Sequence, residues 1–216
     1  MPIKLFYVAT LFALIGATFA ATTVLADQEN AYGFDYVGNN GVYSGIDTAY
    51  PAVRDNGYSY MRVGGQRFVN GNTLFLEIGW NIRYEDPGYP SPRSYWAWRP
   101  TNRVAYYGFD GYPGSGNYSY EITYLGGGEW RFFYNDMANP VATHYMGDID
   151  YMDDYFSGGE TSSASNEMGP SNNINVQYLR GGSWYPAIGW QTNNTNPSVY
   201  NVIPVINPQS WQVYSY

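Results

Sequence analysis

Apolar and polar residues alternate along several stretches of the chain, with the period of two that is typical of a half-buried β-strand. The longest such stretch is TLFLEIGWNIRYE, at positions 73–85. One face of this predicted strand carries Leu74, Leu76, Ile78, Trp80, Ile82 and Tyr84, and the other carries Phe75, Glu77, Gly79, Asn81 and Arg83. The segments YSYEITYL and GGGEWRFFYND alternate in the same way. We therefore expect strands with one side turned toward a core.

Glycine, proline and asparagine interrupt these aromatic-rich stretches about every ten residues, which indicates the turns of an all-β sandwich or barrel. LGGG at 125–128 predicts one hairpin turn. Gly181-Gly182 predicts another, between NINVQYL and SWYPAIGW, while VYNVIPVI and SWQVYSY predict two closing strands. No segment shows the pattern of an amphipathic helix.

The first 26 residues have the pattern of a secretory signal peptide. Lys4 precedes an almost wholly apolar run, and Val24-Leu25-Ala26 supplies small or neutral residues before a cleavage site. The apolar run is shorter than the roughly 20 residues that a membrane span needs. We expect a secreted, extracellular protein with one domain at 27–216 and no membrane contact after cleavage of the signal.

The charge of the chain restricts the kinds of partner that the protein can bind. The chain has 18 acidic against 10 basic residues and a net charge of −8, whereas nucleic-acid binding requires a basic surface. It has no cysteine and one histidine, His144, so thiol catalysis and multi-histidine metal sites are excluded. We expect no cofactor and no metal at a catalytic site. Four aspartates at 148, 150, 153 and 154 leave open a solvated acidic loop or a calcium site.

Two glutamates stand in unusual settings. Glu77 lies in the middle of the apolar strand at 73–85, where burial is costly unless the carboxylate is paired or protonated. Gly79, two residues on, leaves room for another chain to approach. Glu160 follows two glycines in SGGETSSASNEMG. Taken singly, Glu77 also fits the solvent face of an ordinary sheet, and Glu160 an ordinary turn.

Taken together, the two segments resemble a known family. The strand Glu77-Ile78-Gly79-Trp80, the later Gly158-Gly159-Glu160 and the turn Glu167-Met168-Gly169 are similar to motifs of the neprosin family of secreted glutamic peptidases. A more distant resemblance is to the eqolisin peptidases, which carry a glutamine where this chain has Glu77. The resemblance spans residues 43–185 and is specific only at these motifs. Plant neprosins have cysteines, which this chain lacks.

The resemblance implies a lectin-like sandwich of two antiparallel sheets, with Glu77 and Glu160 facing each other in a substrate groove. Two neighbouring carboxylates cannot both ionise cheaply, so one serves as acid and the other as base. By analogy with eqolisins, Glu160 is the base that activates a water molecule, and Glu77 assists at the oxyanion; the reverse assignment stays open. The predicted activity is that of an endopeptidase working at acidic pH on a protein or peptide substrate.

Further residues are candidates for substrate binding and for modification. We expect substrate contacts from Trp80, Trp96, Trp98 and Glu167, although Trp96 and Trp98 also suit a core. Asn117 and Asn193 begin N-glycosylation sequons.

A second hypothesis remains open on the sequence. The richness in tyrosine, glycine and asparagine also fits a non-catalytic secreted β-sandwich, which would bind carbohydrate or self-assemble as an extracellular structural or filament subunit. The two hypotheses differ in geometry. A peptidase requires the carboxylates of Glu77 and Glu160 to converge in an open groove, whereas a filament subunit would cover that groove or leave them apart.

Overall fold

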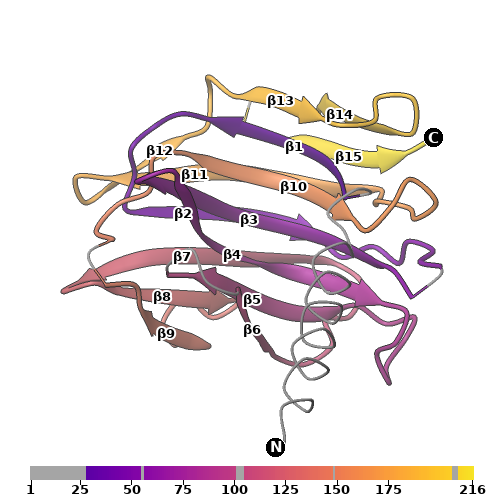
Figure 1. Ribbon diagram of the computed structural model, residues 1–216, viewed down its shortest axis with the longest axis horizontal. Helices are drawn as coiled ribbons and strands as arrows, with labels where there is room; N and C mark the ends of the chain where they lie inside the picture. The colour runs from indigo at the N-terminus through magenta and orange to yellow at the C-terminus, as the bar shows by residue number, and fades with distance from the viewer. Residues whose placement is uncertain (1–27, 55, 101–104, 148, 206–208) are drawn as a thin grey trace, which may run out of the picture.

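The computed structural model describes residues 28–54, 56–100, 105–147, 149–205 and 209–216. Over these residues it is an all-β sandwich of two antiparallel sheets, as predicted (Figure 1). The predicted signal peptide lies outside the described residues. Among the residues described, no helix has the length and apolarity needed to cross a membrane.

One sheet has seven strands, in the order β13-β1-β10-β3-β4-β5-β6. Its strands are β1 (Glu29–Asp35), β3 (Tyr58–Val69), β4 (Asn72–Arg83), β5 (Arg93–Arg99), β6 (Tyr106–Phe109), β10 (Tyr155–Thr161) and β13 (Gln191–Asn194). The centre of this sheet is therefore formed by β10, β3 and β4, which come from distant parts of the chain.

The other sheet has eight strands, in the order β14-β15-β11-β2-β7-β8-β9, with β12 paired to β11. Its strands are β2 (Gly41–Asp47), β7 (Asn117–Gly126), β8 (Glu129–Tyr134), β9 (Ala142–Tyr145), β11 (Ser171–Arg180), β12 (Ser183–Pro186), β14 (Tyr200–Pro204) and β15 (Trp211–Ser215). Both predicted hairpins are confirmed, since β7–β8 and β11–β12 pair across glycine turns with positive φ. The two predicted closing strands are β14 and β15, which pair with each other.

The core lies between the two sheets. From β4 it takes the face predicted to be apolar, Leu74, Leu76, Ile78, Trp80 and Ile82, and from β7 and β8 it takes Tyr120, Ile122, Trp130 and Phe132. Tyr84 lies past the end of β4 and is half exposed. Because alternate residues of a strand point to opposite sides, burial of this face turns Glu77 outward on the seven-stranded sheet.

Two glycines lie on either side of the central strand, β3. Gly79 on β4 and Gly158 on β10 pair with the same residue of β3, Arg62, from its two sides. A Cβ on Gly79 would overlap the carbonyl oxygen of Met61 and lie 2.7 Å from the Cα of Arg62. The close approach that the sequence suggested at Gly79 is therefore an approach of β3.

Substitution of Gly79 by alanine should destabilise the fold by about 1–3 kcal/mol, the usual cost of forcing atoms into a packed position. Thermal unfolding followed by circular dichroism would measure the loss. Gly111→Ala is the matched control, because nothing lies within 4 Å of a Cβ at Gly111. Equal unfolding temperatures for the two variants would contradict the close packing of β3 against β4.

Candidate functional site

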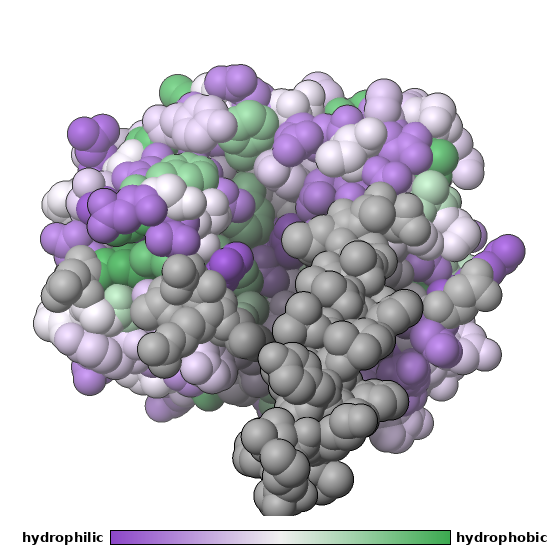
Figure 2. All heavy atoms as spheres, viewed as in Figure 1, coloured by the Kyte–Doolittle hydropathy of each residue, from purple (hydrophilic) through white to green (hydrophobic). Residues whose placement is uncertain are grey.

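A cavity of about 460 Å³ opens on the outer face of the seven-stranded sheet. Figure 2, which looks from the same side as Figure 1, shows hydrophilic and apolar residues interspersed over this side of the molecule. The cavity is lined by Gln28, Asn30, Tyr32, Tyr58, Tyr60, Arg62, Gln66, Phe75, Glu77, Arg83, Arg99, Ala105, Tyr107, Phe156 and Glu160. The lining is therefore rich in tyrosine and arginine, and it contains both glutamates named from the sequence.

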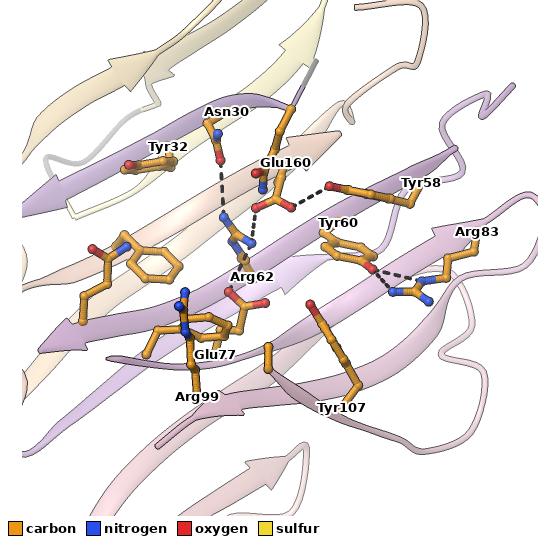
Figure 3. Close-up of a pocket in the computed structure, with 15 residues that line it drawn as sticks. Asn30, Tyr32, Tyr58, Tyr60, Arg62, Glu77, Arg83, Arg99, Tyr107 and Glu160 are labelled. Atoms are coloured by element: carbon orange, nitrogen blue, oxygen red, sulfur yellow. Dashed lines mark hydrogen bonds and ion pairs between the residues drawn. The ribbon is translucent and has the colours of Figure 1, made fainter. Parts of the chain in front are cut away.

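Strand register brings the two glutamates together. On β10, Glu160 pairs with Tyr60, and on β4, Glu77 pairs with Gly64. Both partners belong to β3, which lies between the two strands. The carboxylates therefore lean toward each other across β3, and Arg62 rises midway between them on the same face (Figure 3).

The guanidinium of Arg62 joins the two carboxylates. Its Nη1 lies 3.1 Å from Oε2 of Glu77 and also forms an ion pair with Oε2 of Glu160. Its Nη2 donates to Oδ1 of Asn30 at 3.3 Å. The side chains are almost completely withdrawn from solvent, with 12% of Arg62 and 6% of each glutamate exposed. The expected pair of facing carboxylates thus has a cation between its members, which differs from the simple proton-sharing pair that the sequence suggested.

Arg62 was missed by the sequence reasoning, although a signal for it exists. It alternates with Tyr58 and Tyr60 in YSYMRVGG, which places all three on one face of a strand. The glycines at 79 and 158 flank it in the neighbouring strands. Nothing in the sequence alone fixes the pairing of β3 with both β4 and β10, and that pairing gives Arg62 its position.

Three tyrosines support the carboxylates from one side. The hydroxyl of Tyr58 donates to Oε1 of Glu160, and the hydroxyl of Tyr95 donates to Oε1 of Glu77, both at 3.1 Å. The ring of Tyr60 lies between the other two, with centroids 4.5 Å from Tyr58 and 5.0 Å from Tyr95. Each carboxylate thus receives a hydroxyl on one oxygen and the guanidinium on the other.

Burial and, to a lesser extent, the neighbouring Glu160 raise the pKa of Glu77 to about 7, against the opposing effect of Arg62. The loss of water around a charged group favours its neutral form, and a like charge nearby acts in the same direction. Glu77 therefore holds a proton in mildly acidic solution, which is the protonation state that an acid requires.

The structure places the three tryptophans away from the cavity lining. Trp80 is fully buried between the sheets, where its Nε1 donates to the carbonyl of Asp47. Trp96 and Trp98 lie on the core side of β5 and contact His144, which accepts a hydrogen bond from Trp96 at 3.1 Å and stacks on Trp98. Of the two alternatives for Trp96 and Trp98, the structure favours packing.

Glu167 also lies outside the cavity lining. Its Oε2 accepts the backbone N–H of Ala52 at 2.9 Å. The next residue, Met168, is buried behind β10, and its sulfur would lie 2.7 Å from a Cβ on Gly159. The Glu-Met-Gly turn therefore supports the back of the strand that carries Glu160.

Both sequon asparagines are engaged in hydrogen bonds. Nδ2 of Asn117 donates to Asp47, and Nδ2 of Asn193 donates to the hydroxyl of Tyr32. Their glycosylation stays a prediction.

Two of the four clustered aspartates hold the far end of β3, and Asp148 lies outside the described residues. Asp153 and Asp154 accept the backbone N–H groups of Phe68 and Gln66, both at 2.7 Å. Within the described part of the chain, no group of three or more histidine, aspartate or glutamate side chains is arranged to hold a metal ion.

Comparison with known proteins identifies similar folds and no similar sequences. No protein-family model and no curated protein sequence matches the chain. Solved structures do match. A scytalido-glutamic peptidase crystallised with a transition-state analogue inhibitor has a TM-score of 0.66 and 8% identity, over 89% of this chain and all of that one. The same peptidase with a peptide-based analogue gives 0.60 at 9% identity, over 90% of this chain and all of that one.

A third structure is SCP-B, described as a member of the eqolisin family in complex with the tripeptide Ala-Ile-His. Its TM-score is 0.58 at 8% identity, over 90% of this chain and all of that one. The fold is thus that of the eqolisin-type glutamic peptidases, as the distant resemblance implied, while the likeness to neprosin rests on the sequence motifs alone.

Replacement of Arg62 by methionine should destabilise the fold more strongly at pH 8 than at pH 4. Removing one partner of a buried ion pair typically costs about 3–5 kcal/mol. The pKa of Glu77 already stands above its ordinary value of 4.5 and would rise further without the guanidinium. A raised folded-state pKa gives stability that is present below the unfolded value and is lost as the pH rises through the folded value.

Urea unfolding at pH 4, 6 and 8 would measure this difference. Arg180→Met is the matched control, because Arg180 is exposed at the end of β11 in the other sheet. A loss in Arg62→Met that does not change with pH would contradict the role of Arg62 as the counter-ion of the carboxylates.

Proposed function

We propose that this chain is a secreted glutamic endopeptidase, of neprosin-like type, that hydrolyses peptide bonds with water activated by Glu160 and Glu77. The observation that carries the proposal is the convergence of these two buried carboxylates in a cavity on a sandwich shared with glutamic peptidases. The resemblance of the two glutamate motifs to neprosins supports it independently.

Glu160 serves as the general base. It removes a proton from a water molecule as the water oxygen attacks the carbonyl carbon of the substrate. Protonated Glu77 donates a hydrogen bond to the oxygen of that carbonyl as it becomes negative. The proton held by Glu160 then passes to the nitrogen of the leaving amine, and the C–N bond breaks. Each step uses only side chains of the cavity and water.

Arg62 and the tyrosines support the separate roles of Glu160 as base and Glu77 as acid. The guanidinium contacts both glutamates, so it offsets negative charge at the moment when the base is ionised. The hydroxyls of Tyr58 and Tyr95 fix one oxygen of each carboxylate. The raised pKa of Glu77 supports its assignment as the acid.

The non-catalytic alternative receives less support from the geometry. A filament subunit would leave the two carboxylates apart or cover the groove, whereas in this single chain they lie together at the wall of a cavity. Carbohydrate contact and self-assembly stay predictions from composition.

Glu160→Gln and Glu77→Gln should each reduce hydrolysis by about a hundredfold or more, because each removes a proton-transfer or oxyanion group from the reaction. The measurement is digestion of casein and of a proline-rich peptide across pH 2 to 8, followed by mass spectrometry of the products.

Glu121→Gln is the matched control. Glu121 lies on β7 of the other sheet, outside the cavity lining, and burial raises its pKa to about 7 as well. Cleavage that persists in both site variants would remove the assignment.

The rate of cleavage by the wild-type protein should fall as the pH rises through about 7. The acid form of Glu77 is required, and its pKa, raised to about 7 by burial, marks where that form is lost. In Arg62→Lys, which keeps the charge, the alkaline limb of kcat/KM should stay within about one pH unit of the wild-type position. An alkaline limb near pH 4.5 would show that Glu77 behaves as an ordinary exposed carboxyl.

A further inference from the structure

Arg83, at the end of β4, lies at one end of the same cavity and is held there by aromatic side chains. Its Nε donates to the hydroxyl of Tyr60 at 2.9 Å, and Nη2 donates to the same oxygen. The centre of its guanidinium lies 5.6 Å from the ring centroids of Tyr60 and Tyr107 and 5.9 Å from that of Phe109. Figure 3 shows Arg83 beside Tyr60, whereas the hydroxyl of Tyr107 points toward Glu77.

The charge of Arg83 is not neutralised as the charges of its neighbours are. Three other arginines, Arg62, Arg67 and Arg93, each have a carboxylate oxygen within 4.0 Å. Over the residues that the structure describes, Arg83 has no carboxylate oxygen at that distance. Asp86 attracts it at longer range, but the ion pair of Asp86, at 3.6 Å, is with Arg93.

The remaining donors of Arg83 make it suitable for an anion. A guanidinium has five N–H donors in a planar fork, and Tyr60 uses two of them. The fork matches the two oxygens of a carboxylate, and the rings around it fix its direction and displace water. A partly buried cation with unused donors in the wall of a cavity has the properties of an anion-binding subsite.

We propose that Arg83 binds a carboxylate of the peptide substrate. The carboxylate belongs to an aspartate or glutamate side chain or to the C-terminus of the peptide. This proposal rests on the proposed function and adds the substrate class, a peptide that carries a negative charge to one side of the scissile bond. The chain has an excess of acidic residues, which would repel an acidic peptide from most of its surface. The positive charge of Arg83 would attract such a peptide to the cavity.

The test is a binding measurement that does not depend on turnover. Fluorescein-labelled octapeptides are made in pairs that differ by glutamate or glutamine at one position, and in further pairs that end in a free carboxylate or an amide. Their affinities for the wild-type protein are measured by fluorescence anisotropy at pH 8, where the peptide carboxylates are ionised and hydrolysis is expected to be slow. At least one acid peptide should bind about tenfold more tightly than its amide partner.

Variants assign the preference to Arg83. Arg83→Gln should abolish the difference within that pair, Arg83→Lys should retain part of it, and Arg180→Gln, which removes an equal charge from the other sheet, should leave it unchanged. The position of the effective acid distinguishes a side-chain carboxylate from a C-terminal one. Thermal unfolding of each variant controls for loss of the fold.

The outcomes separate the two proposals. Equal binding of every acid and amide pair, or a preference that survives in Arg83→Gln, overturns the subsite. Digestion at pH 5 is measured beside the binding. An acid preference with no cleavage leaves the subsite standing and removes the peptidase, whereas cleavage without any acid preference does the reverse.

Discussion

The site depends on the need of two buried carboxylates for a cation. Two like charges that are both withdrawn from water repel each other strongly, and a folded chain tolerates them only when they are paired or protonated. Here Arg62 meets both, and each glutamate gains a tyrosine hydroxyl as well. Gly79 and Gly158 pair with Arg62 in register from its two sides. A Cβ on Gly79 would overlap the backbone of β3, and a Cβ on Gly158 would overlap the backbone of β1, so both glycines allow the strands around Arg62 to pack closely.

The cation between the carboxylates changes how such a pair works. Without it, two neighbouring carboxyl groups would divide one proton according to their mutual repulsion alone. With it, the positions of the two groups in the sheet decide which one keeps a proton, and burial raises the pKa of Glu77 to about 7. The tyrosine row formed by Tyr58, Tyr60 and Tyr95 connects this centre to Arg83, so the groups proposed for acid–base chemistry and the group proposed for anion binding lie along one wall of the cavity.

The sequence was sufficient for the fold class and for the two glutamates, and insufficient for their surroundings. Period-two alternation identified the face of β4 that packs into the core between the sheets, although residues 76–82 are buried on both faces. It could not separate core from cavity for Trp96 and Trp98, since both locations favour large aromatic side chains. Arg62 and Arg83 were not recognised as parts of the site because their positions depend on pairing between strands that lie far apart in the chain.

The groups proposed for chemistry stand on three adjacent strands, and not on the loops that join them. A strand changes sides at every residue, so one inserted or deleted residue within β3 would turn Arg62 into the sandwich and bring Met61 or Val63 out in its place. Divergent relatives can therefore lengthen or shorten their connecting segments freely, while the spacing inside β10, β3 and β4 must be inherited unaltered. Between folds as similar as these, which share only 8–9% of their residues, such spacing is a more durable feature to compare than residue identity.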